Sequence, residues 1–514
     1  MFSTSFSYKK NTYTFLAIVA IFKLIAANFV ELGNDEAYYY SYALAPALNY
    51  FDHPPMIAWL IQISTLNLTG VTDACMRLGP IITSTIASIF IFKTTVILRN
   101  AKAGWYAVLL YQASVYGGFI AGWFVLPDAP QAPFWCAALY FMACLIVQQK
   151  SNQNKTWYWL GICIGAATLS KVHGLYLWAG FGLYILIHKR NWMLNYRLYV
   201  SFLITLLFTT PILIWNIQNN FITYKFHSNR VVVKNFNSND LLREIVGEIL
   251  YQNPVVYAII LIALIYFFKR KIVQQNQIIQ WLLCMSLPMV LLFWYFASYN
   301  PIFPHWSGPA FVALIIMAAL YIEKHTNRLF PKKIILSLAL VYTVITVAIG
   351  FVQVAPRNFG SQDVHNYGEY CPTLDVSGWK NLSIKFKELK QQDILQNQMQ
   401  SNSVILINKW FPAAQLEYYV GRLTHTSLIA TGTVEDVHQF AWLNEKRHFT
   451  IGQDAYVIVP SNMSIDVDKM YARYFKEIQK PVTINQIRSN KVVRYFYVWR
   501  LKNCIDTTFK TTLN

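Results

Sequence analysis

Long apolar runs separated by short polar segments fill the first 354 positions of the chain. Many windows of about 16 to 22 residues are nearly free of charge, and a helix of that length crosses the hydrocarbon core of a bilayer. The pattern predicts about eleven such helices, near residues 12–30, 77–98, 104–122, 131–148, 156–169, 174–188, 198–216, 249–268, 277–297, 307–322 and 334–353. We therefore expect residues 1–354 to form an α-helical transmembrane domain.

The pattern changes after residue 354, where charges of both signs mix and the apolar pieces become short. It predicts strands at 403–410, 425–431, 454–461 and 492–501, and amphipathic helices at 411–421 and 433–447. Residues 355–514 are therefore expected to form a soluble α/β domain. Cys371 and Cys504 both lie in this domain, and a disulfide between them is one of the alternatives that the sequence leaves open.

The composition is that of a membrane protein, because 55% of the residues are hydrophobic and only 13% are charged. The formal net charge of +19 is spread over alternate loops instead of one soluble module, which argues against a nucleic-acid-binding protein. Loops rich in Lys and Arg stay in the cytoplasm, so we expect the N-terminus inside and residues 355–514 outside. The first apolar run lacks a small-residue cleavage pattern and is expected to remain as a span.

Four short segments at the outer ends of the predicted spans hold the candidate chemistry. They are "GNDEAYYY" with "YFDHPP" in the outer loop 31–76, "WFVLPDAP", "LSKVHG" and "YNPIFPHWSGP". Charged residues in such positions of membrane proteins tend to mark substrate sites. The candidate site residues are Asp35, Glu36, Tyr39, Asp52, His53, Asp128, Lys171, His173 and His305.

Each acidic candidate has two interpretations. Asn34 or Asp35 is expected to cap a helix that begins at Glu36, and the two adjacent acids would point about 100° apart on that helix. One carboxylate would then address a substrate while the other braces it. The alternative is a plain helix cap beside an interfacial belt of tyrosines. Asp52 and Asp128 lie next to prolines, where helix capping is again the alternative to substrate binding.

The basic candidates suggest a bound anion. Lys171 lies between two short apolar helices with almost no loop, so it either reaches lipid phosphates or binds an anionic ligand. His53 suits a phosphate contact, subject to its charge near neutral pH. A base on an acceptor hydroxyl, together with a cation on a phosphate, would serve a group transfer in which the phosphate leaves.

Five strings carry a family resemblance. The string "DEAYYYSYALAPALNYFDHPPMIAWL", followed by "PDAP", "GAATLSKVHGLYL", "PILIWNIQN" and "PHWSGPAF", resembles bacterial members of the dolichyl-phosphate-mannose protein mannosyltransferase superfamily. These are GT-C fold enzymes related to the lipid A aminoarabinose transferases. The strings follow one another in order, and their succession is more specific than any one of them.

The resemblance implies an inverting membrane glycosyltransferase that moves a sugar from a polyprenyl monophosphate carrier to a lipid, protein or glycan acceptor. It implies that transfer occurs on the outer face of the bacterial cytoplasmic membrane. It also implies Asp35 as general base, Glu36 as its support, and both Lys171 and His53 at the donor phosphate. The aminoarabinose branch commonly has a lysine at the "PP" turn, where this chain has His53. Other substrate contacts are expected from Tyr39, Asp52, Asp128, His173 and His305.

No cofactor is expected, and no cluster with metal-ligand spacing is evident in the sequence. Four carboxylates would suit a divalent ion if they converged, namely Asp35, Glu36, Asp52 and Asp128. Other function classes stay open: a polymerase or ligase with a lipid diphosphate donor, a lipid flippase or transporter, and an inactive relative that only binds its ligand. Transporters usually show repeat symmetry and polar residues at the bilayer midplane, whereas the polar residues here gather at the outer ends.

Overall fold

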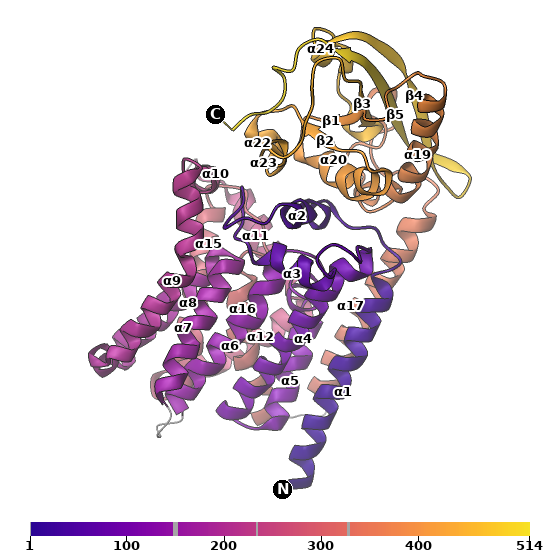
Figure 1. Cartoon of the computed structure of the whole chain (residues 1–514). Helices are drawn as coiled ribbons and strands as arrows, with labels where there is room; N and C mark the ends of the chain where they lie inside the picture. The colour runs from indigo at the N-terminus through magenta and orange to yellow at the C-terminus, as the bar shows by residue number, and fades with distance from the viewer. Residues whose placement is uncertain (1, 148–152, 233–234, 326–328, 514) are drawn as a thin grey trace. The chain divides into compact units, whose positions relative to one another are not determined.

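The computed structural model describes residues 2–147, 153–232, 235–325 and 329–513 (Figure 1). The chain forms two compact units. The helical unit comprises residues 1–25 and 47–344, and the α/β unit comprises residues 26–46 and 345–514. Residues 26–46, which the sequence placed at the end of the first span and in the outer loop, thus fold with the C-terminal part of the chain.

The described elements of the helical unit are helices. They are α1 (Phe2–Ala26), α3 (Met56–Ser64), α4 (Asp73–Leu98), α5 (Ala101–Ala113), the π-helix η1 (Tyr116–Ile120), α6 (Asp128–Val147), α7 (Gln153–Ser170), the short 3-10 helix η2 (Val172–Leu175), α8 (Tyr176–His188), η3 (Arg190–Leu194), α9 (Tyr196–Gln218), α10 (Ile222–Val231), α11 (Ser238–Tyr251), α12 (Pro254–Lys269), α13 (Ile272–Gln275), α14 (Gln277–Cys284), α15 (Leu287–Ala297), α16 (Gly308–Lys324) and the start of α17 (Leu329–Val354).

Several of these helices are suited to a bilayer. Among the described residues, five helical segments are long and apolar enough to cross a membrane, namely Asp73–Leu98, Asp128–Val147, Tyr196–Gln218, Gln277–Ala297 and Pro331–Val354. The helices α11 and α12, bent by 102°, would add a sixth if they form one broken span. The chain is therefore a multi-pass membrane protein, and the number of eleven spans stays a prediction.

The helix α6 lies inside the bundle, because 72% of its apolar window is buried against 11% for the window of α17. The helices α4 and α7 pack against α6, and α9 packs against α7. Gly161 on α7 allows that last contact, since a Cβ at this position would collide with the backbone of Ser201 on α9. Small residues permit this close approach between membrane helices. The packing holds the first residue of α6 and the end of α7 in fixed positions.

The α/β unit is built on a five-stranded sheet of β1 (Val404–Ile407), β2 (Leu428–Ala430), β3 (Ala455–Pro460), β4 (Phe475–Arg488) and β5 (Lys491–Cys504). The strand order is β2-β1-β3-β5-β4. Strand β1 runs parallel to β2 and to β3, and β5 runs antiparallel to β3 and β4. In this register Ile405 is paired with Leu428 on one side and with Tyr456 on the other. Four of the strands lie where the sequence pattern predicted them.

The edge strand β4 was not predicted, because Pro481 interrupts its pattern. Proline has no backbone N–H to donate to a sheet, so it is confined to edge strands and bulges. The pairing of β4 with β5 shifts register between Gln479 and Val482, which places Pro481 in a bulge. A strand of 14 residues therefore exists where the pattern looked irregular.

Helices cover the sheet and extend beyond it. They are α2 (Asn34–Leu44), α18 (Pro372–Asp375), α19 (Trp379–Leu395), α20 (Trp410–Gln415), the π-helix η5 (Leu416–Gly421), α21 (Arg422–Thr424), α22 (Val434–Val437), α23 (Phe440–Asn444) and α24 (Val467–Tyr471), with the 3-10 turns η4 (Val364–Asn366) and η6 (Ser461–Met463). The helix expected at 433–447 is broken at His438, whose φ of 51° is not helical. The His438 ring stacks on Trp410, with the ring centroids 5.5 Å apart, at the position where the helix is interrupted.

Cys371 and Cys504 are both free thiols, so the disulfide between them is contradicted. Cys371 packs with Leu374 and Val493, whereas Cys504 belongs to a different apolar cluster of the same unit. The two thiols are buried apart, and sequence spacing alone gives no sign of this separation.

Candidate active site

Asp128 and Lys171 form a buried ion pair in the helical unit. Asp128 begins α6, and Lys171 directly follows α7; because these consecutive helices pack together, the start of one lies near the end of the other. Lys171 Nζ donates to Asp128 Oδ2 at 2.9 Å and to Oδ1 at 3.1 Å. The two side chains are only 2% and 5% exposed. Removing two charges from water is costly, so such a pair persists only with close geometry and further hydrogen bonds.

Two uncharged side chains complete the hydrogen bonding of the pair. The Tyr116 hydroxyl, on the π-helix η1, donates to Asp128 Oδ1 at 3.1 Å. Gln131, one turn into α6, donates from Nε2 to the Lys171 carbonyl oxygen at 3.0 Å. The Asp128 carboxylate thus accepts bonds from a cation and a hydroxyl, while Lys171 Nζ has no other acceptor among the described residues. The sequence reading missed Tyr116 and Gln131, because neither the "YGGFI" segment nor a mid-helix glutamine carries a signal by itself.

Three predicted histidines lie within electrostatic reach of this ion pair. The charges of Asp128 and Lys171 act on His53, His173 and His305, which come from three different loops. Burial lowers the pKa of His53 to about 3, although the nearby Asp52 carboxylate opposes the effect. Burial also lowers the pKa of His305 to about 4. Both rings are therefore neutral at pH 7 and can donate or accept a hydrogen bond without adding charge.

A fourth histidine joins the cluster. His227 lies on α10, and its Nε2 is 2.6 Å from the Asp52 carbonyl oxygen, which requires a proton on that nitrogen. The ring centroids of His227 and His53 are 5.9 Å apart. His227 thus fixes the loop that carries Asp52 and His53. The sequence reading missed it, although a histidine in the polar segment "YKFHSNR" next to a predicted outer loop was a usable signal.

Aromatic rings contact two of the three histidines. The His173 ring lies 5.4 Å from Phe293 and 6.1 Å from Trp306, in edge-to-face geometry. The His305 ring lies 5.9 Å from Tyr251. Apolar walls around a few polar groups are typical of sites that bind a substrate away from water.

Asp35 and Glu36 lie in the α/β unit, on the first turn of α2, and have different environments. The helix begins at Asn34 with Gly33 as its N-cap, so the expectation of a cap by Asn34 or Asp35 was wrong. Glu36 is buried, and its Oε2 accepts the Gly33 backbone N–H at 2.9 Å, which is the half of a capping box that a glycine N-cap permits. Asp35 is exposed. Only Asp35 therefore presents its carboxylate at the surface of the unit.

Tyr39 is buried in the aromatic core of the α/β unit, where its ring contacts Tyr38 at 5.4 Å and Tyr42 at 5.3 Å. Of the nine predicted site residues, Asp35, Glu36 and Tyr39 thus belong to the α/β unit. The structure brings the other six together within the helical unit, namely Asp52, His53, Asp128, Lys171, His173 and His305. In the described part of the chain, no three histidine, cysteine or acidic side chains are arranged to hold a metal ion.

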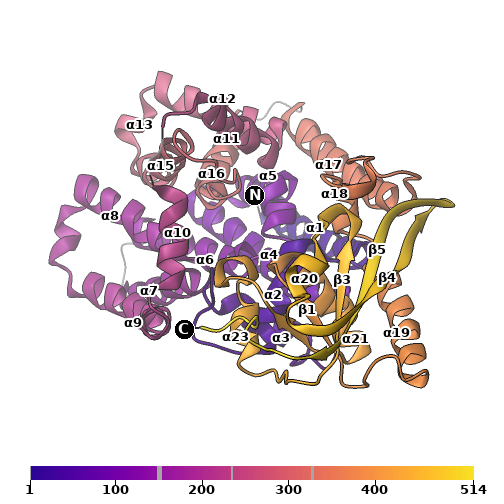
Figure 2. The ribbon, with the colours of Figure 1, turned by 90° about the horizontal axis from the view of Figure 1, so that it is seen from above.

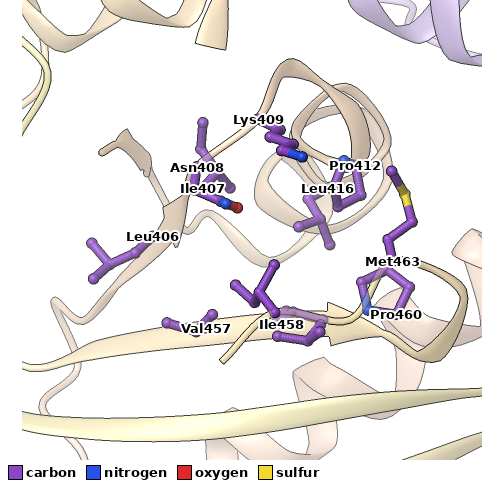
Figure 3. Close-up of a pocket in the computed structure, with 12 residues that line it drawn as sticks. Leu406, Ile407, Asn408, Lys409, Pro412, Leu416, Val457, Ile458, Pro460 and Met463 are labelled. Atoms are coloured by element: carbon purple, nitrogen blue, oxygen red, sulfur yellow. The ribbon is translucent and has the colours of Figure 1, made fainter. Parts of the chain in front are cut away.

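A small pocket lies at the carboxyl ends of β1 and β3, between strands whose connections leave in opposite directions (Figure 3). Ligands of open parallel sheets bind at such a point. The side chains of Leu416 and Ile458 lie across the pocket, which has a volume of only about 20 Å³. That space holds roughly one water molecule and not a sugar. The stronger candidate site is the ion pair with its histidines.

Comparisons with known proteins agree with this architecture. A family model described as dolichyl-phosphate-mannose-protein mannosyltransferase matches residues 52–215, which include Asp52, His53, Asp128, Lys171 and His173. The lipid A galacturonosyltransferase RgtD of Rhizobium johnstonii is 22% identical over 328 residues, covering 62% of this chain and 66% of that protein. The match thus spans slightly less than two thirds of the relative's length.

Two solved structures of ArnT from Cupriavidus metallidurans share the fold over nearly the whole chain. The structure bound to undecaprenyl phosphate matches with a TM-score of 0.63 and 15% identity, covering 95% of this chain and 97% of ArnT. The apo structure matches with a TM-score of 0.60, also at 15% identity, over 96% and 98% of the two chains. The chain therefore shares the fold of ArnT, and the family match and the galacturonosyltransferase agree with the resemblance seen in the sequence.

Proposed function

We propose that this chain is a membrane glycosyltransferase that moves a sugar, with inversion, from a polyprenyl monophosphate to a lipid, protein or glycan acceptor on the outer face of the membrane. The buried Asp128–Lys171 pair among neutral histidines carries the proposal. A relative with the same fold binds undecaprenyl phosphate, and another is named as a lipid A galacturonosyltransferase.

The donor phosphate is the group that Lys171 suits. Its ammonium has three N–H donors, and Asp128 takes two of them. The third is left for a phosphate oxygen, and His53 and His305 supply neutral hydrogen bonds. Donors fixed in a low-dielectric site stabilise the charge that develops on a leaving phosphate better than water does. Asp128 orients the Lys171 ammonium through these two bonds.

The acceptor needs a base, and we assign that role to the exposed carboxylate of Asp35. It removes the proton of the acceptor hydroxyl as the hydroxyl oxygen attacks the anomeric carbon. The bond between that carbon and the phosphate oxygen breaks in the same step, and the electron pair leaves with the polyprenyl phosphate. One displacement inverts the anomeric carbon. Glu36 accepts the Gly33 N–H at the start of α2, and in this role it stabilises the first helical turn, which carries the base.

Sugar transfer with purified protein tests the proposal. Radiolabelled polyprenyl-phosphate sugars are incubated with extracted lipid, protein and glycan fractions, using wild type, Asp35→Asn and the control Asp468→Asn. Asp468 is likewise exposed in the first turn of a helix of the α/β unit. Label should enter one fraction with wild type and Asp468→Asn, and Asp35→Asn should lose at least about 100-fold in rate.

The outcomes separate the function classes. Transfer only from lipid diphosphate donors would replace the proposal with a polymerase or ligase activity. No transfer from either donor type, with protein that elutes as a folded monodisperse species, would exclude the enzyme assignment. Full activity of Asp35→Asn would leave the glycosyltransferase in place but remove Asp35 as the base.

A further inference from the structure

The short segment that carries Asp35 is anchored to the α/β unit from Glu31 onward. The buried Glu31 carboxylate accepts the backbone N–H groups of Trp379 at 2.8 Å and of Lys380 at 3.1 Å. These are the first two residues of α19, whose N–H groups have no partner within the helix. Glu31 therefore caps a helix that lies 348 positions away in the sequence.

The residue after Glu31 is bound on both sides of its peptide backbone. The Leu32 N–H donates to the Tyr419 hydroxyl at 2.6 Å, and the Leu32 carbonyl accepts a bond from Gln415 Nε2 at 2.8 Å. Tyr419 lies on η5, and Gln415 ends α20. The approach of the chain to α2 is thus fixed by side chains of two adjoining helical segments.

The helix α2 lies against the same two segments, and Figures 1 and 2 show α2 beside α20. The Tyr38 ring contacts Trp410 at 5.3 Å and His438 at 5.8 Å. The Tyr40 ring contacts Tyr418 at 5.1 Å. Isolated helices shorter than about 12 residues are marginal in water, and α2 has 11 residues. Its order therefore depends on these contacts.

A buried arginine supports the anchor from within the α/β unit. Arg494 is fully buried, donates from Nη2 to the Ser377 carbonyl oxygen at 2.8 Å, and lies over the Trp379 ring at 4.4 Å. Burial lowers the pKa of Arg494 to about 9, and the charges of Glu31 and Asp375 oppose that effect. Arg494 is therefore charged at pH 7 and electrostatically favours Glu31 at the start of α19.

We propose that the α/β unit serves to position the catalytic base, with Glu31 and Arg494 as positioning residues for α2 and thereby for Asp35. This inference rests on the proposed function, because it takes Asp35 as the base. A positioning role lowers kcat when it is lost and leaves the KM for the lipid donor nearly unchanged, since the donor phosphate is assigned to other residues.

The test compares Glu31→Gln with the matched control Glu388→Gln. Glu388 is exposed on α19 itself, and its carboxylate has no hydrogen-bond or ion-pair partner among the described residues. In Glu31→Gln the amide NH2 faces one of the two backbone N–H groups, which then lacks an acceptor. We expect kcat to fall by about 10- to 100-fold, with the donor KM within about twofold of wild type. The control should match wild type in both constants.

Hydrogen exchange provides a readout that needs no substrate. In Glu31→Gln the amides of residues 34–44 should exchange at least about tenfold faster, while those of β3 and β5 keep their protection. Unchanged exchange at 34–44, or a kcat equal to that of Glu388→Gln, would overturn the positioning role. Glu31→Asp, which keeps the charge at shorter reach, should recover part of the lost rate.

A replacement variant and the combined readouts separate failure of the positioning role from failure of the proposed function. If Glu31→Gln fails to fold, Tyr419→Phe replaces it, because this change removes the hydroxyl that accepts the Leu32 N–H, keeps the ring, and should also speed exchange at 34–44. If wild type transfers no sugar, the proposed function fails, and the exchange result still decides whether these residues hold α2. If transfer proceeds normally while α2 is loosened, positioning fails and the glycosyltransferase assignment stands.

Discussion

The helical unit and the α/β unit each bury an aspartate with a cation and a tyrosine, and the two arrangements are nearly alike in hydrogen bonding. Asp128 accepts bonds from Lys171 and Tyr116. Asp393 accepts two bonds of 2.7 Å from Arg500 and one of 2.9 Å from the Tyr456 hydroxyl. Judged by the ion pair alone, either could be structural.

Their neighbours differ. The planar guanidinium of Arg500 engages both oxygens of Asp393 side by side, and the Tyr456 ring packs edge-on against Phe386 in a closed core. Within the described part of the chain Lys171 has no acceptor for its third N–H, and histidines from three loops lie within electrostatic reach of its pair with Asp128. Unused donors and titratable neighbours, more than the buried charges themselves, distinguish the Asp128–Lys171 pair as the candidate to act on a substrate.

The largest expected effect is on stability. Replacing Arg500 by leucine leaves Asp393 buried without its partner and should lower the free energy of unfolding of the α/β unit by about 3 to 5 kcal/mol. Denaturant unfolding followed by protease protection of the β3–β5 region measures this loss. Sugar transfer per folded molecule should stay at the wild-type rate, and a specific loss of activity would break the contrast between the two pairs.

Lys171→Ala should show the opposite behaviour. The rate of sugar transfer per folded molecule should fall by roughly 100- to 1000-fold, because a donor to the leaving phosphate is lost. Initial rates at saturating donor, normalised to the monodisperse fraction, measure the effect. The variant Asp128→Asn/Lys171→Met removes the stranded charge and should remain equally slow, whereas recovery of activity in it would show that Lys171 acts only as a counter-ion.

The tyrosines that donate to the two buried aspartates predict a smaller difference between the two ion pairs. Tyr456→Phe and Tyr116→Phe each remove one hydroxyl donor to a buried carboxylate, a bond that contributes about 1.5 to 3 kcal/mol. Both changes should lower the melting temperature by a similar amount. Only Tyr116→Phe should slow transfer, by several-fold, since Asp128 orients Lys171. Equal rates in the two variants would remove Tyr116 from the site.

The smallest expected effect is a dependence on pH. The pKa values of His53 and His305 are lowered to about 3 and about 4, whereas the usual value of an unfolded histidine is about 6.5. Between these values the unfolded chain binds more protons than the folded chain. Stability contributed by the two rings is therefore complete above pH 6.5 and is lost as the pH falls toward 4.

Thermal denaturation at pH 7.5 and pH 5 measures this dependence. The melting temperature of wild type should drop at pH 5, and His53→Gln should drop less. His365→Gln, at an exposed position of the α/β unit, should behave as wild type does. An equal drop in all three proteins would assign the pH effect to other groups.

Local pattern predicted much of this fold, because apolar length and alternation are properties of neighbouring residues. Strands β1, β2, β3 and β5 lie where short apolar or alternating runs occur. Strand β4 was not predicted, because Pro481 interrupts its pattern and the bulge that accommodates this proline depends on pairing with β5. The grouping of residues 26–46 with 345–514 depends on contacts such as that between Glu31 and Trp379, and no local pattern reports these.

The candidate site shows the same division. Asp128 and Lys171 were found because charged residues are rare beside apolar runs. Tyr116, Gln131 and His227 were missed, since each acts through a tertiary hydrogen bond in a segment with no unusual composition. The distinct environments of Asp35 and Glu36 follow from the bond between Glu36 and the Gly33 backbone N–H, which depends on where the helix begins.

The capping of α19 by Glu31 also has a consequence for the synthesis of the protein at the ribosome. The two residues that Glu31 binds are made 348 and 349 positions later, and at roughly 5 to 20 residues per second that interval is on the order of 20 to 70 s. During this time the tyrosines of α2 lack the aromatic side chains that they contact in the folded unit. A nascent chain interrupted before residue 379 therefore lacks the partners of Glu31, and under the proposed mechanism Asp35 is positioned only after the α/β unit has been translated.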